Sequence, residues 1–417
     1  MSVSTVEKDG KIFVVDAEDG LLEVKYGLPA NVQFCRTCGN SNQKVLPSII
    51  TADDKVGRKN TIYFEDGQCE ACRVVARKDD IDWEERERKL IELLDKYRSR
   101  NGSWDCMVPG SGGKDSVYQA HILKTKYGMN PLTVTWAPHL YTDVGWRNFQ
   151  NWLHIGGFDN FLYTPDGQTH RKLTELAYRN LLHPFQPFIF GQRHFPMYMA
   201  KKTGVQLIFY GESPAEYGWH VGEDATSLAA AEWYTGDPNS DILISGVPID
   251  ELREYGITRE KLSPYLPMTK EENNQLGLSV HFLGYFLKWV PQECYYYAVE
   301  HTNFEANDER TEGTFSKYNS IDDKLDGFHY WCGHIKFGIG RCTHEACQEI
   351  RHGHIDREEG VALIHKYDGE FPRRYFEEIL EYMNMKEDEF MDIADRFRSP
   401  HLWKKTGNGW ILRHQVK

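Results

Sequence analysis

The sequence of 417 residues lacks a long hydrophobic run, a signal peptide and internal repeats. A helix that spans a membrane needs about 20 predominantly apolar residues. No such stretch is present, so we expect no membrane insertion. The opening stretch, MSVSTVEKDGKIFVV, has neither the basic start nor the apolar segment of a secretory signal. These absences favour a cytoplasmic globular protein.

Positive charge is also scarce, because 49 Lys and Arg stand against 62 Asp and Glu, for a formal net charge of −13. A protein that grips the backbone of DNA or RNA usually has a basic face and a basic total. We therefore expect no nucleic-acid partner, although a local basic groove is compatible with this composition. In a reducing compartment the nine cysteines favour metal binding or chemistry over disulfides.

Apolar residues make up 40% of the chain, enough for one large α/β domain with an appended module. We place a β-rich module at residues 1–80, a linker helix at 81–100 and the main domain at 101–417. Short apolar runs alternate with helical patterns in the main domain, which predicts βαβ units and a parallel sheet. The expected strands are WDCMVP, PLTVTWAP, FDNFLYTP and VQLIFYGES, whereas residues 240–330 are less regular and aromatic and 355–417 mostly helical.

Two C-x-x-C pairs lie in the first 80 residues, Cys35 with Cys38 and Cys69 with Cys72. Each pair can present two thiolates, and two such pairs complete a tetrahedral site for Zn²⁺. The gap between the pairs is longer than usual, which implies a longer loop between them. Because four thiolates fill every position, the spacing predicts a structural zinc site in a zinc-ribbon-like module.

The five other cysteines show no such pairing. Cys332, Cys342 and Cys347 form a looser set that could ligate a second zinc ion or an iron–sulfur cluster. Burial among apolar residues is the more frequent explanation, because free cysteine is among the most buried residue types. For Cys106 and Cys294 we expect burial in the core.

The stretch MVPGSGGKDSVYQAHIL joins an expected strand to an expected helix through a glycine-rich loop. This arrangement places backbone N–H groups and the positive helix end around a small concavity, as an anion site requires. Glycines allow close approach, hydroxyls donate hydrogen bonds and one lysine adds positive charge. The spacing differs from the Walker and dinucleotide-binding patterns. It predicts a phosphate site built from Gly110, Ser111, Gly112, Gly113, Lys114, Asp115 and Ser116.

This loop resembles the SGGxDS signature of the PP-loop ATP pyrophosphatases, which bind the β- and γ-phosphates of ATP and release AMP and pyrophosphate. The chain as a whole is similar to the N-acetyl sugar amidotransferase family of bacterial surface-polysaccharide biosynthesis. The similarity rests on FCRTCGN, FEDGQCEACR, KYGMNPLTVTWAP, DVGWRNFQNW, ERTEGTFSKYNSIDDKLDGFHYW and IKFGIGRCTHEACQEIRHGHIDREEGVALIHKYDGEFP, in the family's order. It implies a PP-loop α/β fold of the adenine nucleotide alpha hydrolase type.

The family resemblance also implies an activity and its partners. An acetamido group of an N-acetylated nucleotide sugar or nonulosonic acid becomes an acetamidino group through an adenylated imidate, with ATP and Mg²⁺, in O-antigen or related lipopolysaccharide synthesis. Ammonia comes from a separate glutaminase of the histidine-biosynthesis type. The sequence agrees with an external source, because it begins Met-Ser and no cysteine lies in a Gly-x-Cys-x-Gly nucleophile elbow.

Charged residues outside the loop are candidates to complete the site. The charge of the departing pyrophosphate must be neutralised by positioned cations and Mg²⁺. Besides the loop lysine, the catalytic candidates are Lys336 and Arg341 in IKFGIGR, which could also be surface charges in a turn. Asp115 and Glu212, the latter just after an expected strand, are candidates for holding Mg²⁺. Helix capping is the alternative for Asp115.

Further polar residues have less specific patterns. Glu312, Ser316 and Lys317 in TEGTFSKY form a cluster that we assign to substrate or phosphate contacts. Histidines occur in aromatic surroundings, and the pattern leaves open whether they are site or core residues. Those singled out are His183, His194 and His220.

Two other functional classes fit part of the pattern. Some PP-loop enzymes of tRNA thiolation also carry an N-terminal zinc module and a three-cysteine site. The acidic balance disfavours that class, and so does the position of the cysteines, since only Cys106 precedes residue 294 in the main domain. A non-catalytic nucleotide-binding protein is the third class, for which an intact SGGKDS loop would be an unneeded feature.

Overall fold

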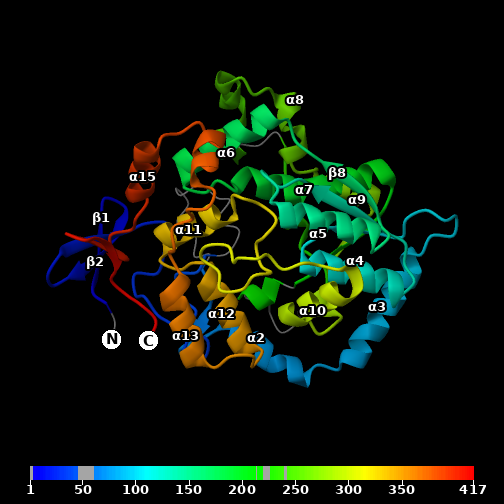
Figure 1. Ribbon diagram of the computed structural model, residues 1–417, viewed down its shortest axis with the longest axis horizontal. Coiled ribbons are helices and arrows are strands. Elements are labelled where there is room, and N and C mark those ends of the chain that lie inside the picture. The colour runs from blue at the N-terminus through cyan, green and yellow to red at the C-terminus, as the bar shows by residue number, and fades with distance from the viewer. Residues whose placement is uncertain (1–2, 46–60, 213, 219–225, 239–241) are drawn as a thin grey trace.

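The computed structural model describes residues 3–45, 61–212, 214–218, 226–238 and 242–417. Its centre is a five-stranded parallel sheet in the order β12–β9–β6–β7–β8 (Figure 1). The strands are β6 (Cys106–Pro109), β7 (Pro131–Trp136), β8 (Asp159–Tyr163), β9 (Leu207–Tyr210) and β12 (Ser279–Phe282). All four strands expected from the sequence are present, and the predicted α/β class with a parallel sheet is confirmed.

Helices cover both faces of this sheet, because its inner strands are apolar on both faces. Val108 and Phe209 lie in one core with side chains from α3 (Trp83–Tyr97), α4 (Lys114–Thr125), α5 (Asp143–His154) and α10 (Pro291–Thr302). Met107 and Ile208, one residue earlier on the same strands, lie in a second core with α6 (Gly167–Leu181) and α7 (Gln186–Thr203). Successive residues of a strand thus serve opposite cores, and the carboxyl ends of the strands are left to carry polar groups.

The strand β12 was not expected from the sequence. It comes from the region 240–330, which looked irregular, and pairs in parallel with β9 at the edge of the sheet. Its four residues, SVHF, form no continuous apolar run, because Ser279 and His281 are polar. The strand exists because β9 provides a partner, which is information that the local pattern does not contain.

The segment between β9 and β12 contains short elements, most of which pack on the second core. These are η2 (Pro214–Tyr217), η3 (Ala231–Trp233), β10 (Leu243–Ile244), β11 (Val247–Pro248), η4 (Ile249–Tyr255), α8 (Arg259–Leu262), η5 (Ser263–Tyr265) and α9 (Lys270–Leu276), with η6 (Leu283–Tyr285) directly after β12. The C-terminal part supplies α11 (Asp326–Phe337), α12 (Arg341–Arg351), α13 (Arg357–Tyr367), α14 (Phe376–Tyr382), α15 (Glu387–Arg396), β13 (Trp403–Thr406) and β14 (Gly409–Leu412).

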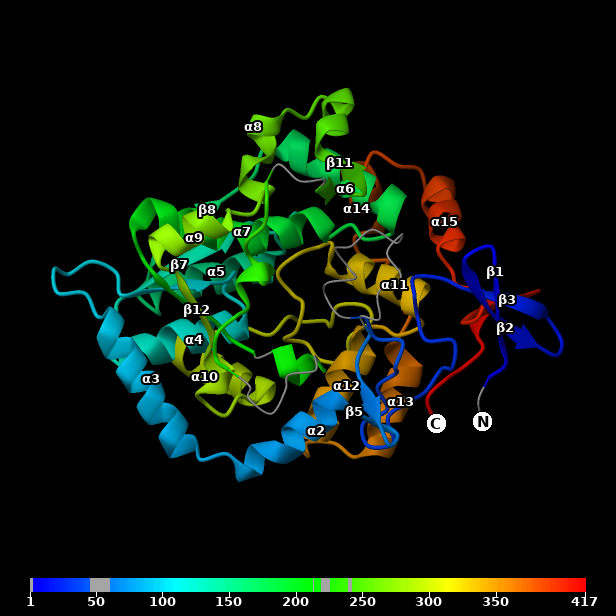
Figure 2. The same cartoon turned by 180° about the vertical axis from the view of Figure 1, so that it is seen from behind.

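The N-terminal part packs against the C-terminal part (Figure 1). The backbone N–H of Lys25 donates to Ser399 Oγ at 3.0 Å, and that of His401 donates to the carbonyl of Glu23 at 3.3 Å. Figure 2 shows α2 next to α12 and α13 on the same side of the molecule. The N-terminal elements are β1 (Thr5–Lys8), β2 (Lys11–Asp16), β3 (Gly20–Val24), β4 (Phe64–Glu65), β5 (Gln68–Cys69), α2 (Glu70–Ala76) and η1 (Arg77–Asp80). The domain limits given above stay predictions.

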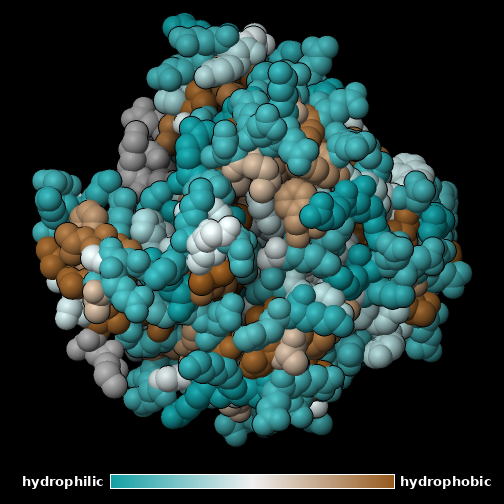
Figure 3. All heavy atoms as spheres, turned by 60° about the vertical axis from the view of Figure 1, so that its left-hand side comes forward, coloured by the Kyte–Doolittle hydropathy of each residue, from teal (hydrophilic) through white to brown (hydrophobic). Residues whose placement is uncertain are grey.

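The surface is largely polar. On the face in Figure 3 hydrophilic side chains predominate, with separate apolar patches between them. Among the described residues, no helix combines the length and the apolar character needed to cross a bilayer.

Candidate functional site

The glycine-rich loop connects β6 to α4 with the geometry of an anion site. It leaves the strand at Pro109 and enters the helix at Lys114, with Gly113 as the N-cap. Within the described chain no side chain caps this helix, so its first N–H groups remain available to a ligand. Gly112 has φ +86°, and a Cβ there would lie 2.6 Å from the Cα of Phe149. Both the conformation and the packing on α5 therefore require glycine at this position.

The segment between α10 and α11 anchors the loop from the outside. Ser111 Oγ donates a hydrogen bond to Asp322 Oδ2 at 2.7 Å. A Cβ on Gly145 of α5 would lie 2.4 Å from the Cα of Asp322, so this segment runs directly against the helix. Ser116 Oγ donates to the carbonyl of Gly113 at 2.9 Å. In this structure both hydroxyls predicted as phosphate donors are engaged in fixing the shape of the loop.

Lys114 and Asp115 form an ion pair at the start of α4. Lys114 Nζ lies 2.7 Å from Asp115 Oδ2, and the lysine is 7% exposed. Burial alone would lower the pKa of Lys114, but the Asp115 and Glu212 carboxylates outweigh it and raise the pKa above its ordinary value. Asp115 Oδ1 is buried without a hydrogen-bond partner among the described residues. Because Gly113 is the N-cap, the alternative role of Asp115 as helix cap is not what the structure shows.

Glu212 lies just beyond β9 and joins this charged group. Its pKa is raised to about 8, first by its removal from water and then by the Asp115 carboxylate, while Lys114 acts in the opposite direction. Gln348 Nε2 of α12 donates to Glu212 Oε1 at 3.2 Å. A buried ion pair between Lys78 and Glu216, with 2.8 Å between Nζ and Oε1, holds the next turn of chain in place. Two carboxylates and a lysine thus meet at the carboxyl ends of β6 and β9.

A cavity of about 460 Å³ opens beside these residues, within the range of about 300–1,000 Å³ typical of ligand pockets. Asp115 and Glu212 lie at its charged side. The aromatic side chains of Tyr210, Trp233 and Phe282 also line it. We call this space the loop cavity.

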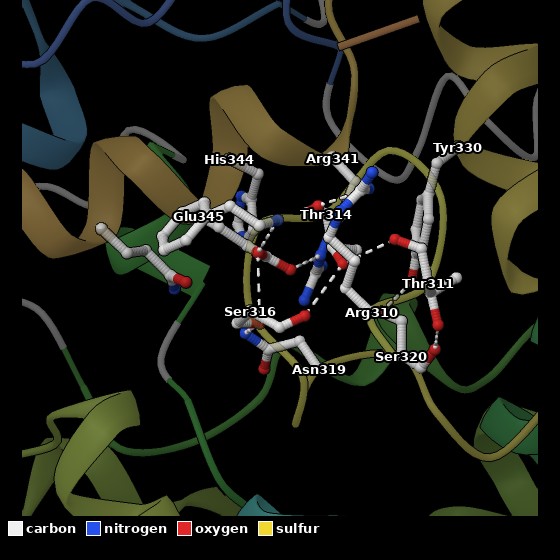
Figure 4. Close-up of polar contacts among 12 residues, drawn as sticks. Arg310, Thr311, Thr314, Ser316, Asn319, Ser320, Tyr330, Arg341, His344 and Glu345 are labelled. Atoms are coloured by element: carbon white, nitrogen blue, oxygen red, sulfur yellow. Dashed lines mark hydrogen bonds and ion pairs between the residues drawn. The ribbon is translucent and has the colours of Figure 1, made fainter. Parts of the chain in front are cut away.

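The helix α12 carries a polar cluster next to the loop cavity (Figure 4). Arg341 Nε donates to Glu345 Oε1 at 3.2 Å, and Ser316 Oγ donates to Glu345 Oε2 at 3.3 Å. Burial raises the pKa of Glu345, and Arg341 opposes that shift. The positive charge of Arg341 also acts on Glu212. The predicted residues Arg341 and Ser316 therefore belong to the same neighbourhood as the loop.

Three other predicted residues make their hydrogen bonds elsewhere. Lys336 Nζ donates to the carbonyl of Leu181 at 2.9 Å and lies 4.7 Å from the ring centre of Tyr26. Glu312 Oε1 accepts from the backbone N–H of Arg374 at 2.9 Å, in an exposed position. Lys317 Nζ donates to the carbonyl of Asp308 at 2.7 Å, also exposed. Their assignment to the site stays a prediction.

The histidines singled out from the sequence have separate surroundings. His194 is buried, and its Nδ1 donates to the carbonyl of Tyr265 at 2.6 Å. His183 stacks on His329, with ring centres 5.0 Å apart. His220 lies outside the described residues.

Sequence reasoning did not find several residues that form the site. Asp322, Glu345 and Gln348 contact the predicted residues, but they come from segments far along the chain. The only local signal was the run of acidic residues in SIDDKLDG, which leads into α11. Neither Glu345 nor Gln348 stands out within α12.

The two C-x-x-C pairs meet in one buried cluster. Cys35 Sγ lies 3.8 Å from Cys72 Sγ, and Cys38 Sγ lies 3.7 Å from Cys69 Sγ. All four sulfur atoms lie within 4.8 Å of one another. A tetrahedral zinc ion with bonds of about 2.3 Å places its sulfur ligands about 3.8 Å apart. The cluster therefore has the ligands and the spacing to hold a metal ion, and it is compatible with the predicted zinc site.

The helix α12 links the cysteine cluster to the loop cavity. Cys347 Sγ donates to the carbonyl of Cys38 at 3.0 Å, and Arg351 Nη1 lies 3.8 Å from Cys38 Sγ. The neighbouring Cys347 lowers the pKa of the Cys38 thiol, which favours the thiolate that a metal needs. Gln348, next in sequence to Cys347, contacts Glu212 instead.

The looser cysteine set does not form a second metal site among the described residues. The four-cysteine cluster is the one group there whose His, Cys, Asp or Glu ligand atoms are close enough for an ion. Cys332 is part of the core of the C-terminal helices, whereas Cys347 packs on the four-cysteine cluster. Cys106 and Cys294 are buried in the core beneath α4, as expected.

Substituting Glu212 with glutamine is expected to stabilise the protein in the absence of ligands at pH 8. The folded pKa of about 8 exceeds the ordinary 4.5, so the stability linked to this proton is complete below about pH 4.5 and is lost as the pH rises through about 8. The variant avoids that loss, which is worth about 4 kcal/mol in the free energy of unfolding at pH 8. Denaturant unfolding at pH 5, 6.5 and 8 measures it.

The exposed Glu305, which pairs with Arg147, provides the control variant Glu305→Gln. This substitution should change the free energy of unfolding only slightly at every pH. A difference between native protein and Glu212→Gln that does not change with pH would contradict the assigned proton.

Similarity to known proteins covers different parts of the chain. Residues 312–417 match the family described as LPS biosynthesis protein WbpG-like, C-terminal domain. Over that part, this match confirms the predicted resemblance to a family of bacterial surface-polysaccharide biosynthesis. An uncharacterized protein of Methanocaldococcus jannaschii is 36% identical over 52 residues, which are 12% of this chain and 19% of that protein. The chain thus spans about a fifth of the length of this relative.

Two solved structures are similar to part of this chain. NMN synthetase from Francisella tularensis is similar over 54% of this chain and 93% of its own, at 16% sequence identity and a TM-score of 0.23. NAD⁺ synthetase from Burkholderia pseudomallei is similar over 56% of this chain and 94% of its own, at 15% identity and a TM-score of 0.23.

Proposed function

We propose that the protein is an ATP-dependent amidotransferase that converts an acetamido group of an N-acetylated sugar into an acetamidino group, in O-antigen or related lipopolysaccharide synthesis. One observation carries the proposal. The uncapped N-terminus of α4 adjoins the buried Lys114 and the carboxylates of Asp115 and Glu212. The family match over residues 312–417 supports the pathway class.

The loop is suited to the phosphates of ATP. Backbone N–H groups at the start of α4 and the positive helix end favour an anion there, and Lys114 adds a full charge beside it. The lysine carries that charge at neutral pH because its pKa is raised. Asp115, whose Oδ1 lacks a partner among the described residues, and Glu212 would hold Mg²⁺, which neutralises phosphate charge when bound.

An amide needs activation before ammonia can replace its oxygen. In the proposed first step the acetamido oxygen attacks the α-phosphorus of ATP, the bond to the β-phosphate oxygen breaks, and pyrophosphate leaves. In the second step ammonia adds to the activated carbon and gives up a proton, and the C–O bond breaks with release of AMP. The product is an amidinium group. Lys114 stabilises the negative charge that grows on pyrophosphate in the first step.

The ammonia is proposed to come from a separate glutaminase. A glutaminase in this chain would need a reactive cysteine that glutamine can reach. All nine cysteines are buried, and burial raises the pKa of Cys106, Cys294 and Cys332, which disfavours the reactive thiolate. These properties support an external nitrogen donor.

A product assay tests the proposed function. The purified protein is incubated with ATP, Mg²⁺ and ammonium at alkaline pH against a panel of N-acetylated nucleotide sugars and nonulosonic acids. AMP, pyrophosphate and the mass of the sugar are measured together. We expect AMP release that depends on one sugar, whose carbonyl oxygen is replaced by NH. Adding a glutaminase with glutamine in place of ammonium then tests the nitrogen donor.

Other outcomes would contradict the proposal. AMP release with tRNA and a sulfur donor, but with no sugar, would identify a thiolation enzyme. The separate surroundings of Cys332 and Cys347 do not support that class. Tight ATP binding without AMP release under any of these conditions would identify a nucleotide-binding protein without this activity.

A further inference from the structure

A second cavity, of about 170 Å³, lies between α11, α12 and the residues around position 44. About 10–15 Å³ is enough for one water molecule, so this space can take part of an organic ligand. Its lining includes His183, His329, Tyr330, Arg341 and His344. We call it the histidine cavity. The function proposed above does not use it.

The charge of this lining is positive. Lys44, Lys336 and Arg341 contribute to it, and none of its described lining residues is acidic. Lys44 Nζ lies 3.3 Å from His344 Nδ1, and burial lowers the pKa of Lys44 to about 8, so the lysine remains largely charged at pH 7. A cavity with cations and without carboxylates favours an anionic ligand.

Arg341 has its planar end available to such a ligand. Glu345 accepts from Nε, and the two terminal nitrogens make no hydrogen bond with the described residues. The guanidinium lies 5.3 Å from the ring centre of Tyr330, and its charge acts on Glu212 and on His329. Two parallel N–H donors match the two oxygens of a carboxylate or phosphate.

The stacked pair of His183 and His329 supplies neutral hydrogen-bonding groups. Both ring nitrogens of His183, which is 4% exposed, and Nδ1 of His329 are buried without a partner among the described residues. Burial lowers the pKa of both rings, to about 3 for His329, so both are neutral at pH 7. A neutral imidazole donates with one nitrogen and accepts with the other. This combination suits hydroxyl groups, which also donate and accept hydrogen bonds.

The histidine cavity adjoins the loop cavity. His344 lines the first and Tyr217 lines the second, and their rings stack with centres 5.3 Å apart. The charge of Lys114 reaches His344, and that of Arg341 reaches Glu212. A ligand held in the histidine cavity therefore lies close to the loop cavity, where the proposed ATP would activate it.

We propose that the histidine cavity binds a hydroxylated ring that carries an oxyanion, with Arg341 on the oxyanion and the pair of His183 and His329 on the hydroxyls. This inference rests on the proposed function and assigns the place where its acidic substrate binds. The oxyanion is either a carboxylate of the ring or a phosphate attached to it.

Calorimetric titration of the full-length protein tests this inference without requiring turnover. The probes are N-acetylneuraminic acid, which carries a carboxylate, N-acetylglucosamine 1-phosphate, which carries a phosphate, and uncharged N-acetylglucosamine. We expect at least one charged probe to bind, and the better of the two identifies the oxyanion. The uncharged sugar should bind about tenfold more weakly or not measurably.

Variants assign the binding to this cavity. Arg341→Gln and His183→Phe are each expected to weaken binding of the charged probe about tenfold or more. The phenylalanine keeps the stacked shape while removing both nitrogens, so it provides a second test if Arg341→Gln does not fold. Arg310→Gln is the matched control. Arg310 also pairs with a glutamate, Glu370, at similar exposure, but it does not line the cavity.

The outcomes separate this inference from the proposed function. Charged probes that bind no better than the uncharged sugar would overturn the inference, and so would folded Arg341→Gln and His183→Phe variants with native affinity. Binding that depends on these residues, in a protein that never forms AMP, would retain the cavity and remove the amidotransferase. AMP formation with an uncharged sugar would retain the amidotransferase and overturn the inference about the histidine cavity.

Discussion

Lys114→Ala is expected to lower the rate of AMP formation about a thousandfold, because it removes the buried positive charge next to the phosphate-binding end of α4. The charge is worth more here than at the surface, since the lysine is 7% exposed and water screens it little. Steady-state release of AMP and pyrophosphate with the identified sugar measures the effect. Because the proposed interaction grows as pyrophosphate leaves, kcat should fall more than the KM for ATP rises.

Two further variants distinguish chemistry from folding. Lys114→Arg keeps the charge and should retain more activity than alanine, although the larger head fits a crowded site less well. Lys126→Ala serves as the matched control, because Lys126 is the C-cap of the same helix and pairs with the distant Glu87. Native turnover in a folded Lys114→Ala protein would remove the loop from the mechanism.

Cys35→Ser is expected to remove bound zinc and to lower the melting temperature by about 10 °C or more. A structural zinc site contributes folding free energy directly. Losing one of four buried ligands leaves three thiolates without their ion, in contact with Arg351 and Cys347 of α12. Metal analysis should give about one zinc per chain in the native protein and almost none in the variant.

The same substitution should affect the rate of chemistry less than the stability. The cluster contacts α12 through Cys347 and Arg351, whereas the loop and its lysine belong to β6 and α4. Turnover per folded molecule, measured at low temperature, separates the two effects. Cys332→Ala is the control, since Cys332 is buried in the core of the C-terminal helices and should leave the zinc content unchanged. Native protein without zinc would refute the structural role.

The sequence was most informative where the relevant residues are close together along the chain. The strand, the loop and the helix of the phosphate site occupy one stretch, and φ +86° at Gly112 explains why glycine is needed there. Each C-x-x-C pair is likewise local, and the cluster shows that the two pairs meet. The weak strand β12 lacked such a local pattern, because it depends on pairing with β9.

Lys336 and Arg341 show where sequence reasoning reached its limit. Five positions apart, they looked equivalent as cations near two glycines. The structure places them on different helices, because α11 ends before Gly338 and α12 begins at Arg341. Lys336 then contacts Leu181, and Arg341 contacts Glu345. Spacing along the chain does not determine the direction of side chains across a break between helices.

By itself the sequence determined the parallel α/β class, the glycine-rich loop between strand and helix and the two cysteine pairs, because each of these has a pattern that is local along the chain. Only the tertiary structure decided which distant groups complete the site. Gln348 reaches Glu212 across 136 positions of sequence, and Ser111 reaches Asp322 across 211. The histidine cavity likewise requires α11 and α12 to pack beside His183. Such contacts follow from the packing of whole cores, which no local pattern of residues specifies.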